Sequence, residues 1–174
     1  MLRKNTSRAL ALLLLAAVGA AAQARDPLTP HEADQVRSTA GFLDRRVPLL
    51  LQFAKARLAR FESVRAASPR PPDRDNILYQ MLSEYRLILP EFDNAVADLG
   101  SAPPKQYKVA KVLDKALTEL QALNAALLRI QTESTPADLA TYRFQLEGCL
   151  DVTADSLDNT RAALQAASKS TPGP

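Results

Sequence analysis

Residues 109–130 read VAKVLDKALTELQALNAALLRI, and this stretch decides the fold class. Its apolar side chains recur after alternating steps of four and three residues, a period that places them on one face of an α-helix. The series is Val109, Leu113, Ala116, Leu120, Leu123, Leu127 and Ile130. No glycine or proline interrupts it. The stretch therefore predicts an amphipathic helix of about six turns that buries a leucine-rich seam.

Three further segments show the same apolar period. They run from Thr29-Pro30 to Val64, from about Asp75 to Leu99, and from Thr135-Pro136 to Leu164. Thr29 and Pro30 suit the cap and the first residue of a helix, and Gly100 is the predicted stop of the second helix. Strand signals are nearly absent, since the chain has only 5 glycines, no Asn-Gly pair and no alternating β-branched run. The chain is therefore predicted to be all-α.

The segments are joined by short connections rich in proline, at 68–75, 100–105 and 132–136. Short connections make consecutive helices run antiparallel. The predicted fold is an up-down-up-down antiparallel four-helix bundle. Pro48 and Pro90 fall inside the first two helices, where each removes a backbone donor and either splits or kinks its helix. Kinks are the favoured alternative, because the apolar period keeps its phase across both prolines.

The N-terminal segment has the pattern of a secretory signal peptide. Arg3, Lys4 and Arg8 precede an apolar run of about 14 residues, shorter than the roughly 20 that span a bilayer. Small residues at 22 and 24 then suit a signal peptidase. We expect residues 1–24 to be removed, 25–167 to form the bundle domain, and 168–174 to be a disordered tail. The alternative is an uncleaved N-terminal anchor. Cleavage predicts an exported protein, periplasmic or extracellular, with no stable membrane span.

Export changes the charge balance of the chain. The full sequence has 22 Lys and Arg against 19 Asp and Glu, and the leader carries three of the basic residues, so 22 − 3 = 19 remain against 19. A chain without net charge has no overall field that would attract nucleic acid or an anionic membrane. Nucleic acid is therefore not an expected partner.

Antiparallel pairing of the last two helices predicts contacts between charged residues. Lys111 and Lys115 on the third helix are expected opposite Asp155 and Asp158 on the fourth, as interhelix charge pairs. The acidic row on the fourth helix could instead bind a cation. That alternative is disfavoured because lysines lie opposite, and because oxygen-only sites normally come from compact loops. No metal site is predicted.

Two other residues are predicted to have structural roles. Pairing of the first two helices brings Arg57 opposite Glu84, which predicts a partly buried ion pair that sets their register. Cys149 is the only cysteine, so it cannot form a disulfide within the chain. A buried free thiol is favoured, and the alternatives are pairing with another chain or a reactive thiol.

Catalytic motifs are lacking in the sequence. His31 is the only histidine, no Glu-x-x-His or Cys-x-x-Cys-His motif occurs, and no glycine-rich loop could hold a phosphate. A nucleophile needs a base within hydrogen-bond reach, and His31 lies far along the chain from Cys149. We therefore predict no enzyme, no catalytic residue and no cofactor.

The predicted function is binding of another protein, or self-association, by an exported non-catalytic bundle. The motivation is apolar surface beside the core stripes, contributed by Leu49, Leu51, Leu87, Leu89, Leu117 and Leu128. The expected partner is thus a protein or a second copy of the chain. The alternative is a small-ligand or lipid-binding bundle with a cavity near Pro48 and Pro90.

Overall fold

The computed structural model describes residues 26–102 and 108–169, and these residues form five α-helices. The helices are α2 (Pro30–Ser38), α3 (Leu43–Ala66), α4 (Arg74–Ser101), α5 (Val109–Glu133) and α6 (Pro136–Lys169). No strand occurs in this part of the chain, so the all-α prediction is confirmed there. The predicted leader, 1–24, and residues 170–174 of the predicted tail lie outside the described residues. Residues 168 and 169 belong to α6.

The fifth helix arises because the first predicted segment is divided. α2 begins as predicted, with Thr29 as its cap, and Glu32 and Thr29 bond to each other's backbone N–H groups in a capping box. It ends at Ser38, in a stretch of serine, threonine and glycine that disfavours helix. A turn closed by the bond from Phe42 N–H to Thr39 O leads into α3. None of the residues of α2 is buried.

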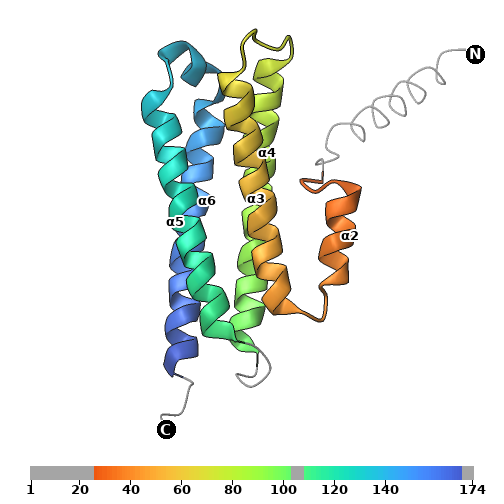
Figure 1. Ribbon diagram of the computed structural model, residues 1–174. Coiled ribbons are helices and arrows are strands. Elements are labelled where there is room, and N and C mark those ends of the chain that lie inside the picture. The colour runs from red at the N-terminus through yellow and green to blue at the C-terminus, as the bar shows by residue number, and fades with distance from the viewer. Residues whose placement is uncertain (1–25, 103–107, 170–174) are drawn as a thin grey trace, which may run out of the picture.

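The four long helices lie side by side, and α2 runs along the outside of α3 (Figure 1). α3 and α5 run in one direction, and α4 and α6 run in the other. The main contacts join α3 to α4, α4 to α6, α6 to α5, and α5 to α3. α4 and α5 are consecutive, yet they hardly touch. They occupy opposite corners, so that α3 and α5 are parallel neighbours.

The core fills the space between these four helices. The seven residues that form the apolar seam of α5 are all buried. α4 and α6 meet through smaller and more polar groups: the hydroxyls of Tyr85 and Thr153 lie 2.8 Å apart, and Ser156 and Thr160 are buried. Within 26–102 and 108–169, no helix combines the length and the apolar character that crossing a membrane would require.

Three predicted helix-breaking positions lie inside helices. Pro48 is within α3 and Pro90 is within α4, and neither helix is divided there. The kinks expected at these prolines remain a prediction. The prediction that Gly100 ends its helix is wrong, because α4 continues to Ser101. A Cβ on Gly100 would lie 3.5 Å from the Cβ of Ala163, so this glycine lies where α4 packs closely on α6.

The substitution Pro90→Ala should stabilise the protein. An interior proline costs a helix about 3 kcal/mol and restricts the unfolded chain by up to about 1 kcal/mol, so we expect a net gain of about 2 kcal/mol. The Pro90 side chain is exposed, so the exchange should leave no hole in the core. Urea unfolding measures the change. An unchanged or lowered midpoint would contradict it.

Candidate functional site

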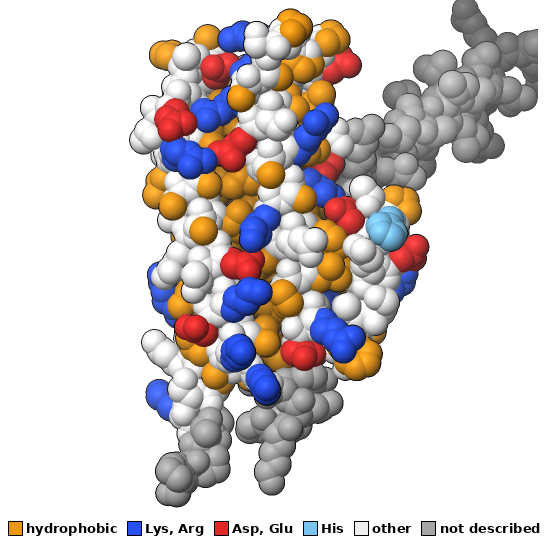
Figure 2. Space-filling model, viewed as in Figure 1, with side chains coloured by type: hydrophobic (Ala, Val, Ile, Leu, Met, Phe, Trp, Pro, Cys, Tyr) orange, Lys and Arg blue, Asp and Glu red, His pale blue; other side chains and the backbone are white. Residues whose placement is uncertain are grey.

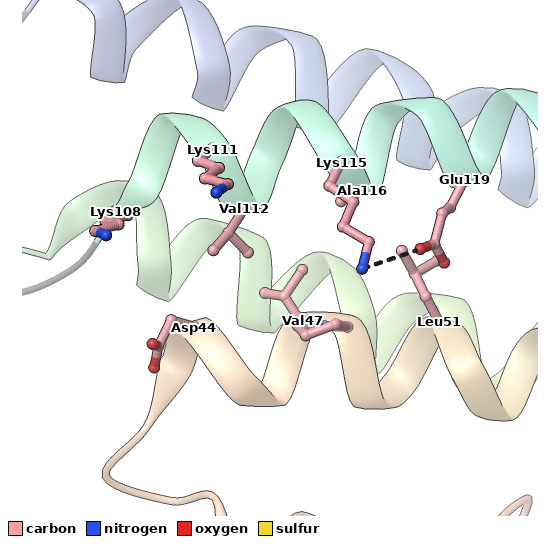
Figure 3. A pocket seen from close by; sticks show the side chains of 10 residues that line it. Asp44, Val47, Leu51, Lys108, Lys111, Val112, Lys115, Ala116 and Glu119 are labelled. Atoms are coloured by element: carbon pink, nitrogen blue, oxygen red, sulfur yellow. Dashed lines mark ion pairs between the residues drawn. The ribbon is translucent and has the colours of Figure 1, made fainter.

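A groove between α3 and α5 is one of the concave features of the described residues. Its volume is about 560 Å³, within the range of roughly 300–1,000 Å³ typical of small-molecule sites. Its floor is apolar and consists of Val47, Pro48, Leu51, Val112 and Ala116. Val47 and Val112 face each other across it (Figure 3). The groove therefore offers a strip of apolar surface between two parallel helices.

The rim of the groove is charged, and its two ends differ. At one end, Glu119 binds Lys115 at 3.9 Å and Lys55 at 3.3 Å, so its charge is shared between two lysines (Figure 3). At the other end lie Lys108 and Lys111, for which no ion pair occurs among the described residues. Asp44 is the carboxylate at this second end. Figure 2 shows Lys and Arg side chains around apolar surface on the lower part of this face.

Both helices of the groove start at the end that carries Lys108. α3 begins at Leu43 and α5 at Val109, and the residues before them, Phe42 and Lys108, provide no side-chain cap. The first amides of a helix carry a partial positive charge. This end of the groove therefore combines two ammonium groups with two helix N-termini, against the single carboxylate of Asp44.

The groove is lined by apolar and charged side chains. Its lining includes no histidine, cysteine, serine or threonine, so a hydroxyl or thiol nucleophile paired with a histidine base does not occur in it. His31 is an exposed residue of α2. Across residues 26–102 and 108–169, no three metal-ligating side chains are close enough to hold an ion together.

Arg57 forms a second polar cluster on the flank of α3 nearest α4. The structure brings Arg57 and Glu84 together, with Nε donating to Oε2 at 2.5 Å. The same guanidinium donates to both carboxylate oxygens of Glu32 at 2.8 and 2.6 Å, and to the carbonyl of Pro27 at 2.9 Å. Arg57 is 8% exposed. It therefore joins α2 and the segment before it to α3 and α4.

The part played by Glu32 was not foreseen from the sequence. Its position three residues after the cap Thr29 is a signal of a helix start, and that signal carries no information about a distant arginine. Hydrogen bonds from Arg57 are the main cause that lowers the pKa of Glu32, from 4.5 to about 2, with burial acting in the opposite direction. The charged form of Glu32 is thus the one that holds α2.

The predicted pairs of Lys111 and Lys115 with Asp155 and Asp158 are not brought together. Lys111 and Lys115 line the groove beside α3. Asp158 instead binds Arg161 on its own helix. Asp155 lies near Asp93 of α4, whose pKa is raised chiefly by burial and to a smaller degree by this neighbouring charge. The charged flanks of α5 and α6 therefore face other helices.

Cys149 lies in the contact between α4 and α6. It is fully buried, and its thiol donates to the carbonyl of Leu82 at 3.3 Å. Burial raises the pKa of this thiol from 9.0 to about 12. The thiolate is the reactive form of cysteine, so a protonated, buried thiol in this position has low reactivity.

The apolar surface differs from the sequence-based expectation. Leu51 and Leu89 belong to the core, and Leu49 and Leu117 are half-buried against it. Leu87 and Leu128 are exposed. Among the described residues, the most exposed large apolar side chain is Phe144 of α6, at 74%, and the guanidinium of Arg86 lies 5.7 Å from its ring centre.

The ion pair between Glu32 and Arg57 predicts a dependence of stability on pH. A carboxylate with a lowered pKa in the folded state stabilises above its unfolded pKa and loses this effect as pH falls through the folded pKa. The melting temperature of the protein should therefore exceed that of Glu32→Gln at neutral pH. The difference should shrink as pH falls from about 4.5 to about 2. Calorimetry at a series of pH values measures it, and a constant difference would contradict the role of Glu32.

Comparison with known proteins gives no match: no family model, no curated protein and no solved structure resembles this chain significantly. The function of the chain must therefore be inferred from its own residues and geometry.

Proposed function

We propose that this chain is an exported, non-catalytic helical binding protein and that its binding site is the groove between α3 and α5. The observation that carries the proposal is the combination of an apolar floor with the charged end of Lys108 and Lys111. An apolar cleft with a few convergent polar groups is the usual form of a small-molecule site. The geometry thus favours ligand binding over the protein partner expected first.

The proposal includes the finer architecture and the processing of the chain. We infer an up-down-up-down four-helix bundle of α3–α6, with α2 as an added helix and kinks near Pro48 and Pro90. Pro48 lines the groove, whereas Pro90 does not, so the cavity expected near both prolines is proposed at the first alone. The basic start and the short apolar run support cleavage after residue 24 and a periplasmic or extracellular location.

The non-catalytic part of the proposal rests on where the reactive side chains lie. His31 is exposed on α2, whereas Cys149 is buried between α4 and α6. General base and nucleophile must approach within hydrogen-bond distance to act together. The positions of these two residues give no support to such a pair, and binding alone accounts for the features of the groove.

A second candidate is binding of a protein or of another copy through the outer face of α6. The observation that favours it is the exposure of Phe144, because an aromatic ring that reaches into solvent beside an arginine is typical of an interface hot spot. Leu87 and Leu128 are exposed elsewhere, on α4 and α5, which are not neighbours. The apolar surface of this candidate is therefore smaller than the sequence suggested.

Filling the groove with a large side chain should weaken ligand binding. Val112 is half-buried on the floor, and Val112→Trp places a large ring in the apolar strip. We expect this variant to bind the apolar anionic dye anilinonaphthalene sulfonate at least about tenfold more weakly than the wild type, by titration calorimetry. The control is Ala97→Trp, in the cavity of about 580 Å³ between α4 and α6. Equal affinity of both variants, with folding verified by circular dichroism, would contradict the proposed site.

The second candidate makes a separate prediction. If Phe144 mediates self-association, the mass measured by light scattering should rise with protein concentration, and Phe144→Ser should remove this rise while retaining helix content. The control is Leu128→Ser, an exposed apolar side chain on a different helix. A strict monomer at every concentration would exclude self-association through this face.

A further inference from the structure

We propose that the ligand of the groove is a single-chain fatty acid, held with its carboxylate between Lys108 and Lys111 and its alkyl chain along the floor. This inference rests on the proposed function, because it names the occupant of the same groove. It follows from three features of the described residues: the charge at each end, the length of the apolar strip, and its width.

The charge of the groove selects one negative head group. Lys108 and Lys111 give two positive charges and Asp44 gives one negative charge, so this end has a net charge of about +1 from its side chains. The N-termini of α3 and α5 add partial positive charge. A monoanion balances this end, whereas an uncharged head group would gain no charge-assisted contact with the two ammonium groups.

The opposite end offers no second site for an anion. Among the lining residues at that end, Lys115 is balanced by Glu119, which it binds at 3.9 Å. Lys55, the other lysine bound to Glu119, does not line the groove. A ligand with a charged group at each end would meet Glu119 at this point. The lining therefore has an excess positive charge at one end of the groove only, which matches an amphiphile with a single negative end.

The apolar strip between the two ends fits one alkyl chain. From Lys108 to Glu119, α5 advances 11 residues, which is about 16 Å at the usual rise of an α-helix. The floor is one side chain wide on each helix, with Val47, Pro48 and Leu51 from α3 and Val112 and Ala116 from α5. Val47, Leu51 and Ala116 are closed into the core, so the strip presents mainly Pro48 and Val112, a width that suits one alkyl chain rather than two.

Pro48 contributes to the same strip through its backbone. Because proline has no N–H group, it cannot donate to the carbonyl of Asp44 four residues earlier, so that carbonyl lacks its usual helical partner. A carbonyl oxygen repels a carboxylate. The head group is therefore favoured beside Lys108, Lys111 and the first amides of the two helices, and disfavoured one turn further along α3, beside this carbonyl.

Titration calorimetry with dodecanoate, below its micelle concentration, tests the inference on the mature protein. We expect dodecanoate to bind, and the affinity to fall about tenfold in Lys111→Gln, because a charge-assisted contact is lost. Lys55→Gln is the matched control, since Lys55 does not line the groove and its charge is paired with Glu119, and its affinity should change less than about twofold. Asp44→Asn should bind several-fold more tightly, because it removes the competing carboxylate. Added salt should weaken binding to the wild type more than to Lys111→Gln.

Three related probes distinguish the possible failures. Dodecanol and dodecyltrimethylammonium should bind at least about tenfold more weakly than dodecanoate; equal binding would overturn the role of the lysines and leave the groove as a site. Tighter binding of dodecyl phosphate, a dianion at neutral pH, would overturn the choice of a carboxylate. If dodecanoate binds Val112→Trp as well as the wild type, the ligand lies elsewhere and the proposed function fails with it.

Discussion

The close packing of α4 against α6 is the constraint on which the positions of the other helices depend. A Cβ on Gly148 would lie 2.6 Å from Nε of Arg86, so a larger residue there would displace the arginine that crosses α6. Gly100, Thr153 and Ser156 have small side chains or none, which allows α4 and α6 to approach closely along the rest of this contact. α6 therefore has α4 on its small-residue flank and α5 on its leucine flank. α4 and α5 are thereby separated, and α3 occupies the remaining corner, in contact with both.

Because of this arrangement, one end of the groove between α3 and α5 is more positive than the other. In an antiparallel pair, the N-terminus of one helix lies beside the C-terminus of the other, and their partial charges oppose each other. α3 and α5 are parallel, so both N-termini lie at one end of the groove, where Lys108 and Lys111 add full charges. If α5 had packed beside α4, as a simple succession of antiparallel neighbours would require, this positive end would not exist. The proposed site thus depends on the order of the helices as well as on its lining residues.

The helices and their buried faces could be predicted from the sequence because the spacing of apolar side chains indicates which face of a helix is buried. All seven seam residues of α5 are buried, and Arg57 lies against Glu84 at the register expected for the first hairpin. The burial of Thr153, Ser156 and Thr160 could not be predicted, because small polar side chains do not mark a buried face by their hydropathy. Because the contact between this face of α6 and α4 could not be predicted, the sequence indicates pairing of α6 with α5 alone. It therefore predicts that the acidic residues of α6 bind the lysines of α5. The groove could not be predicted for the same reason, because it requires α3 and α5 to be neighbours.

Arg57 and the groove lie on different flanks of α3, and this separation makes their functions independent. Glu32 caps the start of α2 through Thr29 and also binds Arg57, so formation of α2 and its attachment to α3 depend on the same carboxylate. Protonation of that carboxylate weakens both at once. None of the residues of α2 is buried, but Val36 packs against the core, so release of α2 would uncover the surface beneath this side chain. The floor and the lysines of the groove belong to α3, to α5 and to the residue that precedes α5, so a loss of α2 would remove no residue of the proposed site.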